Sequence, residues 1–104
     1  HSGTVLEVGP DCMFAYDVEV RTSDEHSILD VASGERINSD RSVHIGQHVW
    51  FGARSVILKG VRIGDDSIIA TGSIVSRDVD SGVVAGGVPA RELRHGVTWD
   101  RRRL

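Results

Sequence analysis

The sequence predicts an all-β solenoid in which short strands and turns wind into stacked triangular coils. The first observation behind this prediction is an apolar residue at every sixth position over much of the chain. The second is the composition, because the 104 residues include 12 glycines and 2 prolines, and only 5% are aromatic. A period of six fits neither an α-helix nor a plain hairpin strand, and this composition is typical of a repetitive backbone that turns often.

The six-residue period is clearest in the central part of the chain. Its large apolar positions are Ile45, Phe51, Ile57, Ile63, Ile69 and Val75. A small or β-branched residue follows four positions after each, namely Val49, Ser55, Val61, Ser67, Ser73 and Val79. We expect both sets to point inward, with each hexad forming a short parallel strand and a turn. Gly46, Gly52 and Gly64 directly follow three of the apolar positions and are expected to relax the turns.

Stacking of the coils follows from the pattern, since a single coil cannot bury its own apolar face. At about 18 residues for three hexads, the chain allows about five coils. An earlier run has the same period but another phase. Its members are Val8, Phe14 and Val20, with Cys12 and Val18 at the small inward offset.

The change of phase predicts an extruded loop. From Val20 to Ile45 is one residue more than a multiple of six, so the two runs join only if the chain between them loops out. We expect this loop at about residues 21–44, a polar stretch with turn-like pairs such as Ser33-Gly34. Loops longer than about a dozen residues in a compact domain are often functional, so the chemistry is expected there.

The period decays after Val79, which divides the chain into a coil domain at residues 1–88 and a C-terminal arm at residues 89–104. Pro89 suits the first turn of a short helix, so residues 90–94 are predicted to form either a helix or an extended segment. The run of Arg101, Arg102 and Arg103 is expected to be a solvated tail.

Charge and composition exclude several functions. A net charge of -3, with 26% charged residues, gives no field for nucleic acid or an anionic membrane. The longest apolar stretches are far shorter than the roughly 20 residues that span a bilayer. Cys12 is the only cysteine, so no intrachain disulfide is expected and the reducing cytoplasm is the expected compartment. The chain begins at His1 without a signal pattern, which indicates a processed or truncated start, or a tag remnant.

Four blocks resemble the hexapeptide-repeat acyltransferases, in particular their sugar and polysaccharide O-acetyltransferase branch. These blocks are residues 45–53, 63–67, 72–79 and 85–90, and the resemblance covers about residues 8–94. It implies a left-handed parallel β-helix that forms a homotrimer with active sites between neighbouring subunits. It also implies an acyl-CoA donor, acetyl-CoA by default, in the groove between coils, and a sugar-type hydroxyl as acceptor.

The resemblance places the general base at His26, because residues 22–28 look like the family's catalytic histidine segment. A neutral imidazole can remove the hydroxyl proton as the oxygen attacks the thioester. No Ser-His-Asp set has a diagnostic spacing, so direct attack is the simpler mechanism. The group that orients the ring stays open among a backbone carbonyl and the acidic residues Asp24, Glu25, Asp30 and Glu35. The alternative is a solvated loop histidine.

Coenzyme A contacts also follow from the resemblance. It assigns the oxyanion donor to the backbone amide of Ala53, since this residue has no side-chain hydroxyl. The pantetheine arm is expected against backbone groups near Ala70 and Ser76. The phosphates are expected at Arg77, Arg91 and Arg94, with Arg77 the best placed, although each of these arginines also fits a solvated surface. Trp50 has an outward offset and is expected to pack on the ligand or on a neighbouring subunit.

Two further functions remain open in the sequence. The first is a trimeric scaffold or binding module that keeps the fold without the chemistry. The second is a zinc enzyme like the carbonic anhydrases of this fold, which needs three histidines such as His26, His44 and His48. Their spacing does not look like that subfamily, so no metal is expected, and His44 and His48 are predicted to be exposed. The acceptor and the acyl chain length stay undetermined.

Overall fold

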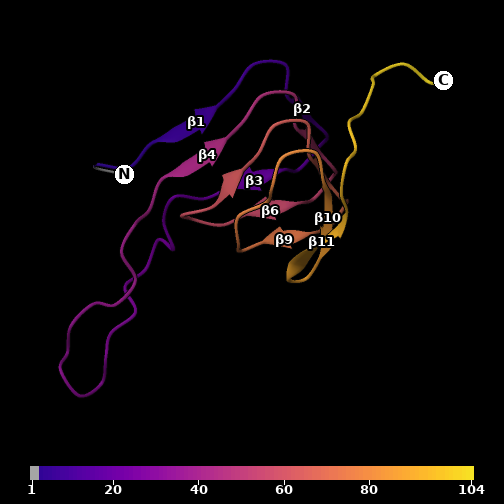
Figure 1. The fold of residues 1–104 in the computed structure, drawn as a ribbon. Coiled ribbons are helices and arrows are strands. Elements are labelled where there is room, and N and C mark those ends of the chain that lie inside the picture. Colours follow the sequence, from indigo (N-terminus) through magenta and orange to yellow (C-terminus); the bar gives the residue numbers. More distant parts are fainter. Residues whose placement is uncertain (1–2) are drawn as a thin grey trace.

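The computed structural model describes residues 3–104, which form eleven short β-strands and no helix (Figure 1). The strands are β1 (Leu6–Val8), β2 (Met13–Phe14), β3 (Glu19–Val20), β4 (Val43–Ile45), β5 (Trp50–Phe51), β6 (Val56–Ile57), β7 (Arg62–Ile63), β8 (Ile68–Ile69), β9 (Ile74–Val75), β10 (Val84–Gly87) and β11 (Ala90–Arg94). None of the described residues belongs to a helix that is long and apolar enough to cross a membrane.

Successive strands lie on successive faces of a triangular prism. The three sheets have the strand orders β1-β4-β7, β2-β5-β8-β10-β11 and β3-β6-β9, and every pair is parallel except β10 with β11. Residues one coil apart therefore lie side by side, as in the pairs Ile45 with Ile63, Phe51 with Ile69 and Ile57 with Val75. The structure confirms the predicted parallel solenoid and its register.

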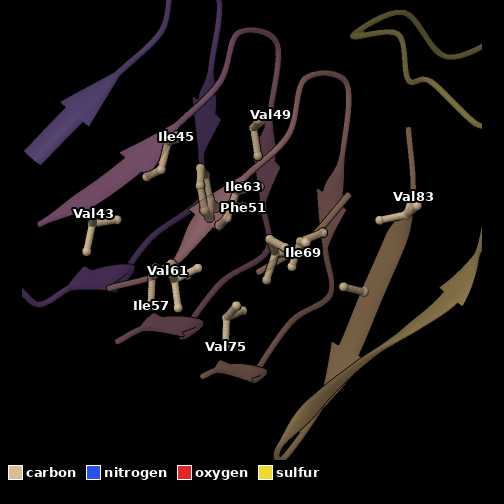
Figure 2. Packing of buried hydrophobic residues seen from close by; sticks show 12 residues of the cluster. Val43, Ile45, Val49, Phe51, Ile57, Val61, Ile63, Ile69, Val75 and Val83 are labelled. Atoms are coloured by element: carbon tan, nitrogen blue, oxygen red, sulfur yellow. The ribbon is translucent and has the colours of Figure 1, made fainter. Parts of the chain in front are cut away.

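The inward positions form the core, as the six-residue period predicts. All twelve inward residues of the central run are at most 6% exposed. Figure 2 shows the apolar members pointing into the prism from different coils. The buried serine hydroxyls have backbone partners, since Ser55 and Ser67 donate to the carbonyls of Gly52 (2.8 Å) and Asp80 (2.6 Å). The small inward position is therefore polar without being unsatisfied.

The first coil is less buried than the others. Val8 and Phe14 occupy inward positions, yet they are 43% and 44% exposed. Phe14 stacks on Phe51 of the next coil, with ring centroids 4.6 Å apart. On its other side no coil lies among residues 3–104, so the apolar interior is open at this end.

The number of coils is smaller than the sequence predicts. The described residues form three complete coils, β1–β3, β4–β6 and β7–β9. A fourth coil begins where Val79 bridges Ile63 and ends with β10. The expectation of about five coils is wrong because the extruded loop and the C-terminal residues use chain length without adding coils.

The predicted role of the glycines also needs correction. Left-handed backbone occurs at every sixth residue, at Asp11, Asp17, His48, Arg54, Gly60, Asp66 and Gly72. Gly46, Gly52 and Gly64 are not among these positions. A Cβ on Gly52 would lie 2.5 Å from the amide nitrogen of Thr71 in the next coil. These glycines therefore permit the close approach of coils, while the turns three positions after each apolar residue contain the unusual backbone.

The loop and the C-terminal arm leave the prism near the expected points. The loop comprises residues 21–42 and protrudes from the coils (Figure 1), ending before the predicted residue 44 because Val43 and His44 pair with β1. Leu29 and Arg36 form an antiparallel bridge within it. Residues 90–94 are extended rather than helical, because they pair with β10 as the antiparallel strand β11.

Candidate active site

The side chain of Asn38 organises the extruded loop from inside. It is only 6% exposed. Its Nδ2 donates to the Asp24 carboxylate (2.9 Å) and to the backbone carbonyl of His26 (2.7 Å). Its Oδ1 accepts from the amide of Ile28 (2.7 Å) and from Nε of Arg36 (3.1 Å). With two donors and two lone pairs used, the amide is fully satisfied and fixes the backbone around His26.

Lys59 ties this loop to the prism. It follows β6, and its ammonium group donates to the Asp24 carboxylate (2.6 Å) and to the carbonyl of Ser39 (2.8 Å). Hydrogen bonds from Lys59 and then from Asn38 hold the pKa of the Asp24 carboxyl below its ordinary value. The ammonium group of Lys59 therefore anchors both ends of the loop, one through the Asp24 carboxylate and the other through the Ser39 carbonyl.

His26 projects from this framework with an exposed ring. Its imidazole makes no hydrogen bond or ion pair with any residue of 3–104. No hydrogen bond or ion pair joins the ring to Asp24, Glu25, Asp30 or Glu35, the acidic residues considered as orienting partners. Asp24 binds Lys59, and Asp30 accepts hydrogen bonds from Ala32 and Ser33 in the loop's own turn. The chain thus presents an imidazole that has no partner within its own described residues.

Three of the residues named from the sequence as coenzyme A contacts line one groove. Ser76, Arg77 and Arg91 border a groove of about 440 Å3 between the segment after β9 and β11. Both guanidinium groups are exposed, and neither is paired within residues 3–104. Arg94 is not part of the groove lining, because it lies at the far end of β11 opposite Val84. The groove also has an acidic side, formed by Asp78, Asp80 and Glu92.

Ala53 and Ala70 lie in successive coils at the same corner of the prism. The amide of Ala53 donates to no acceptor within residues 3–104, while its carbonyl accepts from Gly72 (2.9 Å). A free amide of this kind is suited to stabilising an oxyanion. Both backbone groups of Ala70 are already bonded, its amide to Ala85 (2.9 Å) and its carbonyl to Ser73 (3.2 Å). Ala70 therefore offers a ligand its methyl group and the second lone pair of its carbonyl, but no free amide.

Trp50 has a neighbour that the sequence does not predict. Its indole lies on β5 and is 38% exposed. One side packs on Trp99 of the C-terminal arm, with ring centroids 5.9 Å apart and planes tilted by 51°. The expectation of a ligand or another subunit therefore describes at most the exposed side of Trp50. An aromatic residue in the otherwise polar tail was the available signal for Trp99.

Two further predictions about the surface are wrong. His48 is not a free exposed histidine, because it binds Asp11 and stacks on Trp99 with a centroid distance of 3.8 Å. Arg101 is not part of a solvated tail, because it donates to the Asp11 carboxylate (2.6 Å). Both contacts join residues distant in sequence, which is why no local pattern reveals them.

The three histidines of the zinc alternative have different surroundings in this chain. His44 pairs with Glu7 on the neighbouring strand β1, and His48 is held between Asp11 and Trp99. Among residues 3–104, the side chains close enough to share a cation are those of Asp80, Glu92 and His95, all exposed. That group includes none of the three histidines.

A second groove crosses the outer face of the β1-β4-β7 sheet. It measures about 500 Å3, and none of the predicted coenzyme A contacts lines it. Glu7, Asp65, Asp78 and Asp80 border it, together with His44 and Arg62. It has four carboxylates and one guanidinium group, whereas the groove at Ser76 has three carboxylates and two guanidinium groups, so it is less suited to a ligand with several phosphates.

The fold and the extruded histidine loop define a class of protein, the parallel β-helices built from six-residue repeats. Residues 42–77 match the family model described as bacterial transferase hexapeptide (six repeats). By these matches the chain is similar to the hexapeptide-repeat acetyltransferases, and polysialic acid and galactoside O-acetyltransferases are among the proteins it resembles.

Two relatives illustrate the extent of the match. The polysialic acid O-acetyltransferase of Escherichia coli O1:K1 / APEC is 44% identical over 96 residues, which cover 92% of this chain and 31% of the relative. The galactoside O-acetyltransferase of Escherichia coli (strain K12) is 52% identical over 52 residues, or 50% of this chain and 26% of the relative. The chain therefore spans less than half the length of these relatives.

Solved structures agree with this assignment. The polySia-specific acetyltransferase NeuO has a TM-score of 0.90 at 42% identity, with 93% of this chain and 45% of that chain covered. A galactoside acetyltransferase in complex with coenzyme A has a TM-score of 0.77 at 33% identity, with 90% and 46% covered. These matches confirm the predicted left-handed parallel β-helix.

Proposed function

We propose that this chain acts in an acyl-CoA-dependent O-acetyltransferase that transfers an acetyl group to a hydroxyl of a sugar or polysaccharide. The observation that carries the proposal is the groove lined by Ser76, Arg77 and Arg91, since these residues were named from the sequence as coenzyme A contacts. The homologues named for polysialic acid and galactoside O-acetylation, and the similar structure that holds coenzyme A, support the same donor and acceptor classes.

The proposed reaction is a direct transfer. Nε2 or Nδ1 of His26 takes the proton of the acceptor hydroxyl as its oxygen attacks the thioester carbon. The negative charge that develops on the carbonyl oxygen is met by the free amide of Ala53. The carbon–sulfur bond then breaks, and the coenzyme A thiolate receives the proton from His26. Atoms and charges balance without a metal or an acyl-enzyme.

We place this site between the subunits of a homotrimer. The imidazole of His26 has no hydrogen-bond or ion-pair partner among residues 3–104, which suits a group that acts on a neighbour's groove. The same loop exposes four apolar side chains, those of Ile28, Leu29, Val31 and Ile37. Val31 is 98% exposed. Apolar side chains gathered on one protruding loop mark a contact surface. A cytoplasmic location, expected from the single free Cys12, is part of the same proposal.

The test is a titration of acetyl-CoA and free CoA into the protein, with the oligomer mass recorded on the same sample. We expect about one CoA per subunit of a trimer, and Arg77→Ala should weaken CoA binding about tenfold or more, because a hydrogen bond to a charged group contributes about 1.5–3 kcal/mol. Arg94→Ala is the matched control, since Arg94 lies on β11 outside the groove and should leave the affinity unchanged.

Two outcomes would contradict the proposal. An equal loss of affinity in Arg94→Ala would show that the groove is not the phosphate site. A folded trimer that binds neither CoA nor acetyl-CoA would favour the non-catalytic scaffold instead.

A further inference from the structure

Residues 97–101, here called the C-terminal strap, run back along one corner of the prism toward the first coil (Figure 1). The strap contacts a turn of every coil. These contacts join Val97 to Gly82 (2.9 Å), Thr98 to Asp66 (3.5 Å), Trp99 to His48 (2.7 Å) and Arg101 to Asp11 (2.6 Å). No other segment among the described residues reaches all four coils at one corner in this way.

His48 is the centre of the strap's attachment. Its Nδ1 lies 2.6 Å from the Asp11 carboxylate, and its Nε2 lies 2.9 Å from the backbone carbonyl of Trp99. Both partners are hydrogen-bond acceptors. A neutral imidazole carries one N–H and satisfies only one of them, whereas the doubly protonated ring donates to both. Only the charged form of His48 therefore satisfies both acceptors.

The charges around His48 favour that form. Three carboxylates surround His48: Asp11 on the first coil, Asp66 on the third and Asp100 on the strap itself. Arg101 is the nearby cation, and it binds the Asp11 carboxylate. The hydrogen bond to the Trp99 carbonyl, followed by that to Asp11, raises the pKa of His48 above its ordinary 6.5, although burial acts the other way. His48 and Arg101 together lower the pKa of Asp11.

The strap also contacts Trp50, which was named from the sequence as a contact of the ligand or of a neighbouring subunit. Trp99 is buried at 8% exposure, stacks on His48 with an angle of 7° between the rings, and also packs against Trp50. Arg101 lies over the indole of Trp99 at 4.9 Å from the ring centroid. Trp50 thus packs against Trp99, and Trp99 is itself held by its stacking and hydrogen bonds with His48.

We propose that the C-terminal strap positions Trp50 for ligand binding, with Trp99 as the positioning residue and doubly protonated His48 as the clasp that holds it. The positioning of Trp50 rests on the proposed function, whereas the clasp does not. Because the clasp raises the pKa of His48, its contribution is complete below the ordinary pKa of 6.5 and is lost as the pH rises through the raised pKa. Deprotonation leaves one acceptor without a donor and loosens Trp99.

The clasp can be tested without any activity, because the chain has only 2 tryptophans. In Trp50→Phe, all emission comes from Trp99, and a protonated imidazole stacked on an indole quenches it. We expect the emission to rise between about pH 5 and 9, with a midpoint above 6.5. Asp11→Asn in this background should shift the midpoint downward. His48→Gln should abolish the transition, and the control His44→Gln should preserve it.

Emission that does not change with pH in Trp50→Phe overturns the clasp, and so does a transition that survives His48→Gln. If His48→Gln does not fold, the downward shift in Asp11→Asn decides, and an unchanged midpoint there counts against the clasp.

The positioning of Trp50 is tested by CoA affinity on both sides of the midpoint. With Trp50 unchanged, CoA should bind at least about fivefold more weakly above the midpoint, the lower range of ordinary couplings between sites. His48→Gln should lack this change in affinity. The phosphates of CoA titrate in the same way with both proteins, so the variant corrects for the pH dependence of the ligand itself. Equal pH dependence in the two proteins overturns the positioning. Absence of CoA binding at every pH rejects the proposed function, while the emission of Trp99 still decides on the clasp.

Discussion

Replacing His26 with alanine should lower kcat/KM for acetyl transfer about 10²- to 10⁴-fold, the usual contribution of a positioned general base. The ring is exposed on the loop and has no hydrogen-bond partner in the part of the chain that the structure describes, so its removal takes away the proton acceptor and little else. CoA affinity, the oligomer mass and the free energy of unfolding should stay as in the unmodified protein. The measurement is the steady-state rate of thiol release with a sugar acceptor, alongside a CoA titration.

The control for this experiment is His44→Ala. It removes another imidazole, one that pairs with Glu7 on the outer face of the β1-β4-β7 sheet. That variant should retain its rate. A His26→Ala protein with unchanged kcat/KM would remove His26 from the mechanism and return it to the class of solvated loop histidines.

Asn38→Ala should reduce kcat/KM about 10²-fold, because a displacement of about 1 Å in a catalytic group has an effect of this size. Asn38 supplies four hydrogen bonds inside the loop, and one of them holds the carbonyl of His26 itself. The loss should appear in kcat rather than in CoA affinity, since the groove lies outside the loop. Amide hydrogen exchange of residues 21–42 should accelerate while that of the coils stays slow.

Ser33→Ala provides the comparison within the same loop. The Ser33 hydroxyl bonds only to Asp30 and to the amide of Glu35, in the turn of the loop. Its loss should affect activity far less than the loss of Asn38. A similar effect of the two substitutions would mean that Asn38 is one polar loop residue among others and does not position His26.

Much of the prism could be predicted because its register is repetitive. Each apolar residue, such as Phe51, lies beside its counterpart three hexads later, so one period specifies both burial and strand pairing. The number of coils could not be predicted, since residues 21–42 and the C-terminal arm contribute chain without hexads. The turns were assigned to the wrong residues because the glycines that follow three of the apolar positions are conspicuous in sequence, whereas left-handed residues such as Asp66 and Arg54 are not.

The candidate site also has a part that the sequence predicts and a part that it does not. His26, Ser76, Arg77 and Arg91 could be named because they belong to segments with a recognisable pattern. The residues that hold them could not, since their partners are distant in sequence and depend on how the coils stack. Lys59, which anchors the loop that carries His26, reaches Asp24 from 35 positions away, and Arg101 beside Trp99 bonds to Asp11 from 90 positions away. Such contacts leave no periodic signal in the sequence of a single chain.

The most direct test of the central claim is subunit complementation. A site between subunits takes its histidine from one chain and its arginines from the next, so His26→Ala and the double variant Arg77→Ala/Arg91→Ala damage different halves of each site. The two variants, nearly inactive alone at low acetyl-CoA, are unfolded together and refolded as a mixture. For a head-to-tail trimer, about one quarter of the sites should then be intact. Recovery toward about a quarter of the unmodified rate is the predicted result, and a mixture that stays at the average of the two variants would contradict a site shared between subunits.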